Sequence, residues 1–209
     1  MRVLVTNDDG INSLGLKILA QKALKLGEVI VVAPKVQQSG KSHAINIQEG
    51  LFFEKLNDLI PGVDTYLIDS TPADCVRFAK YFLNDPYDLV LSGINNGYNL
   101  GEDIMYSGTV ACATEAVFTG KKAIAFSTTP YDFSEAELRV EETLEFIFHN
   151  KLLEYANLYN VNIPLNSKGI KITHQGRTHY DTRFVLENNL VYQRGTPNFD
   201  KDNEYINSD

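Results

Sequence analysis

The sequence is poor in cysteine, in basic residues and in long apolar runs. Its two cysteines, Cys75 and Cys112, form no CxxC pair, which argues against a disulfide scaffold and favours buried free thiols. Lysine and arginine number 19 against 27 aspartates and glutamates, a net charge of −8, so the basic footprint of nucleic-acid binders is missing. No apolar run reaches the roughly 18 residues of a membrane span, and no signal segment precedes the first predicted strand. We therefore expect a cytoplasmic protein that binds neither nucleic acid nor membrane.

Short apolar segments alternate with helical patterns along the first 150 residues. Apolar runs bounded by turn-forming residues predict strands at 2–6, 28–33, 64–69, 88–92 and 123–127. The amphipathic segments between them predict helices, with Ser13, Thr71 and Ser134 as N-terminal caps. Alternating buried strands and helices are typical of a doubly wound α/β fold with a mostly parallel sheet. We predict such a Rossmann-like lobe over residues 1–150.

The pattern changes after this lobe. Residues 151–209 contain short strand-like runs and no convincing helix. We predict a smaller β-rich C-terminal extension.

Polar loops follow three of the predicted strands. Asn7–Gly10 follow the first, Gln37–Gly40 the second, and Asn95–Asn96 the strand at 88–92, with Ser107–Thr109 further along the same loop. Parallel strands point the same way, and ligands of open α/β sheets bind outside their carboxyl ends. The three loops can therefore meet in one crevice.

Asp8 and Asp9 are adjacent acids in a tight turn. Without a counter-ion, one of them would tend to stay protonated. Two carboxylates with nearby hydroxyl and amide oxygens suit Mg²⁺, Mn²⁺ or Ca²⁺ rather than zinc or copper, since no histidine or cysteine joins them. Asp-Asp-Gly is also an ordinary turn sequence, so the pair alone leaves both interpretations open.

Ser107, Gly108 and Thr109 precede a predicted helix. The free amide groups and positive dipole of a helix N-terminus can hold a phosphate, although a serine there is also an ordinary cap. His43 lies close to Ser39 in the chain and is either a substrate contact or a structural histidine.

Two familiar nucleotide or hydrolase motifs are incomplete. Ser39-Gly40-Lys41-Ser42 resembles the end of a P-loop, but Lys35 stands where its first glycine belongs. Ser92 likewise lacks the first glycine of a nucleophile elbow. A P-loop NTPase and a serine hydrolase are therefore not supported.

Four blocks of sequence together resemble the SurE (survival protein E) family of 5′/3′-nucleotidases. They are VLVTNDDGINSLG at 3–15, VVAPKVQQSGKSH at 31–43, STPADCVRFA at 70–79 and LVLSGINNGYNLGEDIMYSGTVACATEA at 89–116. The likeness extends more loosely through NVNIP and GIKITHQGRTHYD to about residue 181. Their order and spacing cover most of the first 130 residues.

The resemblance implies a Rossmann-like nucleotidase lobe, an oligomerisation role for the C-terminal part, and a homodimer or homotetramer. It also implies one divalent cation per subunit, Mg²⁺ or Mn²⁺, on the residues that match the family's ligands, namely Asp8, Asp9, Ser39 and Asn95. The block from Tyr106 to Thr109 would lie at the phosphate. Gly40, His43, Asn96, Ser107, Gly108 and Thr109 are the predicted substrate contacts.

The chain departs from the family pattern in two places. The loop reads KVQQSGKSHAI where an arginine-containing version ending in HSIT is more usual. Family members also continue past the segment matching 207–209 into a further strand, which bears on the geometry of the oligomer.

These observations lead to a hypothesis of metal-assisted hydrolysis of nucleoside 5′(3′)-monophosphates, with short polyphosphate as a further substrate. Asp9 or Asp8 would accept the proton of the attacking water, and Asp8 as a nucleophile stays open. The alternative is a non-enzymatic nucleotide-binding regulatory module.

Overall fold

The structure is a computed structural model that describes residues 1–57, 59–84, 87–180 and 182–199. It divides into two compact units. The sheet unit comprises Met1–Asn99 and Met105–Gly169, and the hairpin unit comprises Leu100–Ile104 and the residues from Ile170 onward. The predicted departure at 207–209 lies outside the described residues.

The sheet unit is built on a seven-stranded sheet in the order β3-β4-β2-β1-β5-β6-β7. The strands are β1 (Arg2–Thr6), β2 (Glu28–Pro34), β3 (Phe53–Leu56), β4 (Asp64–Ile68), β5 (Leu89–Asn96), β6 (Lys122–Thr128) and β7 (Leu158–Ile163). All pairs are parallel except β3 with β4. The strand order runs outward in both directions from β1, so the switch point lies between β1 and β5. The predicted doubly wound fold is confirmed.

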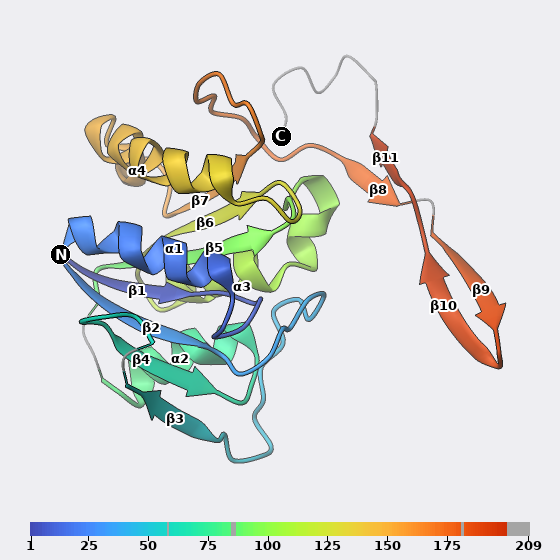
Figure 1. Ribbon diagram of the computed structural model, residues 1–209, viewed down its shortest axis with the longest axis horizontal. Helices are drawn as coiled ribbons and strands as arrows, with labels where there is room; N and C mark the ends of the chain where they lie inside the picture. Colours follow the sequence, from blue (N-terminus) through green and yellow to red (C-terminus); the bar gives the residue numbers. More distant parts are fainter. Residues whose placement is uncertain (58, 85–86, 181, 200–209) are drawn as a thin grey trace. The chain divides into compact units, whose positions relative to one another are not determined.

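Helices cover both faces of this sheet. They are α1 (Leu14–Ala23), α2 (Pro72–Tyr81), α3 (Gly108–Phe118) and α4 (Ser134–His149), with short 3₁₀ turns η1 (Leu24–Leu26) and η3 (Leu152–Glu154). A third 3₁₀ turn, η2 (Gly101–Met105), belongs mostly to the hairpin unit. α1 packs with α4 on one face and α2 with α3 on the other (Figure 1). Within the described part of the chain, no helix has the length and apolar character needed to cross a membrane.

Two of the predicted helix caps are confirmed and one is wrong. The hydroxyl oxygens of Ser13 and Thr71 accept the backbone N–H groups of Leu16 and Asp74. Ser134 does not cap α4, because it already lies in the first turn. Its N–H instead donates to Asp132 Oδ1 at 2.9 Å. The side chain that accepts a backbone N–H at the start of α4 is therefore Asp132, two residues before Ser134.

The continuous apolar runs of β1, β2, β5 and β6 are explained by burial on both faces. Val3, Leu4 and Val5 are fully buried, and the central part of β6 is too. Because helices cover both faces of this parallel sheet, side chains that point to either face are shielded from water, and successive residues of a strand can all be apolar. β7 lies within the residues that the sequence assigned to the extension, and the structure pairs it with β6 in the main sheet.

The hairpin unit contains two antiparallel pairs, β8 (Thr178–Tyr180) with β11 (Pro197–Phe199) and β9 (Arg183–Glu187) with β10 (Leu190–Arg194). Asn188 and Asn189 join β9 to β10, and both have positive φ, 50° and 60°. This is the backbone of the two-residue turn that matches strand twist, and asparagine tolerates it better than most residues. The β-rich C-terminal character predicted from the sequence is confirmed.

Candidate metal and phosphate site

The three polar loops meet at the carboxyl ends of β2, β1 and β5. Gln38 N–H, in the loop after β2, donates to the Asp8 carbonyl at 2.7 Å, and Asn96 N–H, at the end of β5, donates to Asp9 Oδ2 at 2.9 Å. Because β1 lies between β2 and β5, the acidic turn after β1 is the centre of the group. The predicted convergence of these segments at one sheet edge is therefore present.

The acidic turn is held in place by the end of β2. Gly10 has φ +93°, and a Cβ there would lie 3.1 Å from the Val36 carbonyl carbon, so only glycine fits without strain. Ile11 N–H donates to the Pro34 carbonyl at 2.8 Å, and Asn7 Nδ2 donates to the Gly10 carbonyl at 3.0 Å. The turn sequence and the acidic site are thus the same structure, and neither interpretation of Asp-Asp-Gly excludes the other.

Asp9 links the loops on either side of it. Its Oδ2 accepts the Asn96 N–H, and its Oδ1 accepts Gln37 Nε2 at 3.0 Å. Gln37 Nε2 also donates to Ser39 Oγ at 2.9 Å, which brings two of the predicted metal ligands onto one side chain. Sequence reasoning missed Gln37, because a glutamine in a polar loop carries no signal of its own.

Asp8 is buried, with 4% of its surface exposed. The Thr109 hydroxyl donates to its Oδ1. Burial raises the pKa of Asp8 to about 6, while the Thr109 hydroxyl opposes this rise and the nearby Asp9 charge adds to it. Burial also raises the pKa of Asp9, against the bonds from Asn96 and Gln37. In the absence of a cation, the site thus disfavours two full negative charges.

The first turn of α3 lies directly against Asp8. Ser107 caps the helix, since its Oγ accepts the Val110 N–H at 3.1 Å. A Cβ on Gly108 would lie 2.6 Å from Asp8 Cβ and 2.9 Å from Pro72 Cγ, so glycine permits this approach. The cap is confirmed, and the anion-binding role of this helix end stays a prediction.

Asn95 and Asn96 are fixed by different partners. Asn95 Nδ2 donates to the Gly97 carbonyl at 2.8 Å, so its Oδ1 is the atom suited to bind a cation. Asn96 Oδ1 accepts the Tyr131 N–H at 2.7 Å, which ties the end of β5 to the loop after β6.

His43 is held by residues of α3, which α2 supports. Its Nε2 lies 2.8 Å from Glu115 Oε2, and its ring stacks on Phe118 with centroids 5.4 Å apart. Glu115 is buried and also accepts Arg77 Nη1 at 3.0 Å. His43 thereby fastens its loop to α3, which is the structural interpretation, and substrate contact by this residue stays a prediction. Sequence reasoning missed Glu115, whose helical position resembles that of any core-lining residue.

Gly40 and Tyr106 complete the predicted residues. Gly40 has φ +69° with open space where a Cβ would stand, so its backbone is accessible to a ligand. Ser42 N–H donates to the Tyr106 carbonyl at 3.1 Å, which brings the loop after β2 next to the start of α3.

The donor set fits a hard divalent cation. Among the described residues, no group of three or more histidine, cysteine, aspartate and glutamate side chains could hold a metal ion. A site here would therefore draw on the hydroxyl of Ser39 and the amide of Asn95 as well as the two carboxylates. An all-oxygen set of this kind matches Mg²⁺ or Mn²⁺, and a bound cation would offset the repulsion between Asp8 and Asp9.

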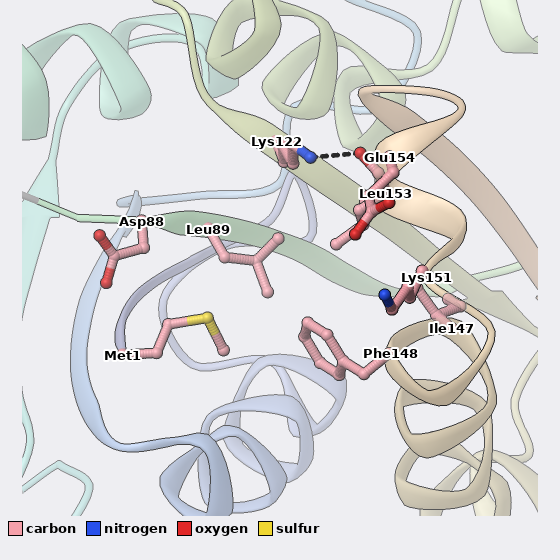
Figure 2. A pocket seen from close by; sticks show the side chains of 9 residues that line it. All are labelled: Met1, Asp88, Leu89, Lys122, Ile147, Phe148, Lys151, Leu153 and Glu154. Carbon is pink, nitrogen blue, oxygen red and sulfur yellow. Dashed lines mark hydrogen bonds between the residues drawn. The ribbon is translucent and has the colours of Figure 1, made fainter.

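A separate pocket of about 270 Å³ lies at the other end of the sheet. It is lined by Met1, Asp88, Leu89, Lys122, Ile147, Phe148, Lys151, Leu153 and Glu154 (Figure 2). Leu89 and Lys122 are the first residues of β5 and β6, so this pocket opens at the amino ends of the strands. None of the predicted site residues lines it.

Comparisons with known proteins identify the family to which this chain is similar. Residues 3–182 match the family described as "Survival protein SurE". A protein named 5′-nucleotidase SurE from Cytophaga hutchinsonii is 42% identical over 192 residues, 87% of this chain and 73% of its own length. Its namesake from Clostridium beijerinckii is 38% identical over 221 residues, 98% of this chain and 86% of that protein.

A solved structure shares the fold as well. The crystal structure of the SurE protein from Aquifex aeolicus matches with a TM-score of 0.75 and 35% identity, covering 93% of this chain and 82% of that one. With its sheet order, its convergent acidic site and a match over residues 3–182, this chain belongs to the SurE family.

Proposed function

We propose that this protein is a divalent-cation-dependent phosphatase of nucleoside monophosphates. The observation that carries the proposal is the position of the buried Asp8 and the adjacent Asp9 against the N-terminus of α3. A site for phosphate alone would not place two carboxylates beside amide groups that attract anions. With a cation bound to the two carboxylates, the carboxylates and the helix N-terminus can act on the same phosphate group. The curated relatives named 5′-nucleotidase support the same substrate class.

A divalent cation on Asp8, Asp9, Ser39 and Asn95 would polarise a phosphoryl oxygen and supply a bound water as nucleophile. The chain carries a net charge of −8, so the long-range field repels a phosphate. Amide groups at the first turn of α3, those of Ser107 and Gly108, offset that repulsion locally and stabilise charge on the phosphoryl oxygens, while the Thr109 N–H donates to the Asp8 carboxylate.

Asp9 is the proposed general base. Its carboxylate is less buried than that of Asp8 and is held from two sides by Gln37 and Asn96. It would take the proton of the attacking water as the oxygen–phosphorus bond forms, and return it to the leaving nucleoside oxygen. Asp8, fixed by the Thr109 hydroxyl, would stay in place throughout as a ligand.

The test is release of phosphate from a nucleoside 5′-monophosphate with Mn²⁺ or Mg²⁺, before and after EDTA. We expect turnover that EDTA abolishes and added Mn²⁺ restores. Unchanged turnover after chelation would reject cation dependence. Binding of the nucleotide without any phosphate release would favour the regulatory module instead, and release from tripolyphosphate in parallel would decide whether the site also takes polyphosphate.

The hairpin unit is proposed to join subunits. Phe184, Leu186 and Val191 are between 63% and 69% exposed, and the register places Leu186 opposite Val191. Apolar side chains gathered on a two-stranded hairpin are typical of an association surface. A homodimer or homotetramer in solution is the expected state, and sedimentation equilibrium measures it.

A further inference from the structure

Two asparagines of β7 reach the loop that follows β5. Asn160 and Asn162 alternate with Val161 on the strand, so their side chains lie on the same face. Asn160 Nδ2 donates to the Asn99 carbonyl at 2.8 Å, and Asn162 Nδ2 donates to the same oxygen at 2.9 Å. Both lone pairs of one loop carbonyl are therefore used by β7.

Asn162 binds the other backbone group of Asn99 as well. Its Oδ1 accepts the Asn99 N–H at 2.9 Å, so a single side-chain amide pairs with both backbone groups, as a neighbouring strand would. Asn99 is 5% exposed, and its own Nδ2 donates to Ser127 Oγ at 2.8 Å. Without these partners a buried loop peptide would keep unpaired polar groups, which is costly.

Asn99 lies close in the chain to the candidate site. Only Gly97 and Tyr98 separate it from Asn96, whose N–H donates to Asp9. The Tyr98 hydroxyl is bonded to Thr129 Oγ1 at 2.6 Å, so this short connection is fastened at both of its last two residues. A displacement of the Asn99 backbone would therefore also displace Asn96, because only two residues connect them.

The side-chain amide of Asn160 is only half used, because its nitrogen has a partner and its oxygen has none among the described residues. Its Oδ1 is buried without a hydrogen-bond partner, while its Nδ2 is bonded. A buried acceptor without a partner destabilises the fold, so an asparagine at this position is explained by its amide donor alone.

We propose that Asn162, assisted by Asn160, is a positioning residue for the phosphate site. The two side chains hold Asn99 and, through it, keep Asn96 against Asp9. The catalytic part of this inference rests on the proposed function, whereas the anchoring of the loop does not require substrate or cation.

The experiment compares Asn162→Ala and Asn160→Ala with Asn157→Ala, an exposed asparagine just before the same strand. The first readout is hydrogen–deuterium exchange of the metal-free protein. We expect the amides of residues 96–99 to exchange about 10-fold faster in Asn162→Ala, while those of β1 keep their wild-type rates. Asn160→Ala, which loses one bond and also removes the unpaired oxygen, should fold normally and show a smaller increase.

The second readout is steady-state phosphate release at a temperature where circular dichroism shows every variant folded. We expect kcat to fall by about 10-fold or more in Asn162→Ala, with KM within threefold of wild type, because the loop is misplaced rather than lost. Asn157→Ala should match wild type in both readouts.

Wild-type exchange at residues 96–99 in Asn162→Ala would overturn the anchoring. Faster exchange with an unchanged kcat would overturn the positioning role and leave a structural one. A wild-type protein that releases no phosphate would instead reject the proposed function, and the exchange rates would still accept or reject the anchoring.

Discussion

The two units of the chain use β-strands in opposite ways. In the sheet unit, β1 lies between two other strands and under helices, and four of its five residues are buried. In the hairpin unit, all five residues of β10 are exposed and the strand has a single partner. An isolated two-stranded hairpin is marginally stable in water. The sheet unit thus contains the buried core and the candidate site, while the exposed strands of the hairpin unit fit its proposed role in binding another subunit.

Asp9→Asn should produce the largest effect and confine it to activity. The change removes the charge of a proposed metal ligand that is also the proposed base, so phosphate release should fall by about 100-fold or more. The mass in solution should stay that of the wild type, because Asp9 lies in the sheet unit. Asp64→Asn, an exposed carboxylate at the amino end of β4, is the control. Full activity in Asp9→Asn would contradict the assignment of the site.

Replacing Phe184 and Leu186 by serine should lower the mass in solution and leave the acidic site intact. The double change removes exposed apolar surface from β9, so sedimentation equilibrium should show dissociation toward monomer. Tyr155→Ser, which changes an even more exposed aromatic residue in the sheet unit, should leave the mass unchanged. An unaltered mass in the double variant would remove the hairpin from the interface.

Gly108→Ala tests how closely α3 must approach the acidic turn. The added methyl group would overlap Asp8 Cβ, and overpacking of this kind costs about 1–3 kcal/mol. We expect a lower free energy of unfolding in urea together with lost activity, since Asp8 itself must move. Gly50→Ala, where a Cβ meets open space, is the matched control, and equal stability of the two variants would contradict the close contact.

Glu115→Gln tests the attachment of the loop that carries Ser39. His43 and Arg77 each contact one oxygen of the Glu115 carboxylate. Glutamine would place an NH₂ group in the position of one of these oxygens, so one of the two partners would lose its acceptor. The pair partners are partly exposed, so we expect a loss of only about 1 kcal/mol in stability. Thermal unfolding beside Glu145→Gln, an exposed glutamate of α4, measures it, and identical melting would show that the ion pairs do not hold the loop.

The smallest expected effect is the inertness of both thiols. Burial raises the pKa of Cys112 to about 12 and also raises the pKa of Cys75, so both stay protonated and shielded near pH 8. The native protein should therefore leave Ellman's reagent unreacted over minutes, and guanidinium should release two thiols. Rapid reaction of either cysteine in the native state would show that the sheet unit opens around it.

The site was partly predictable because its signals are local. Asp8 and Asp9, the cap at Ser107 and the succession of strands and helices along the chain can each be recognised from neighbouring residues. Gln37, Glu115 and Asn162 could not be found in this way. Each acts through a partner at least 28 residues distant in the chain, and a polar residue in a loop, helix or strand gives no indication of which distant group it will meet.

The sequence by itself determined the parallel sheet, the helices between its strands and the placing of acidic residues after β1 and of asparagines at the end of β5. These features follow from apolar periodicity and turn chemistry, which depend on residues close in the chain. Only the tertiary structure decided that α3 would lie against Asp8, that His43 would pair with Glu115, and that β7 would anchor Asn99. Those contacts depend on how helices and strands pack, and packing is set by the whole core at once.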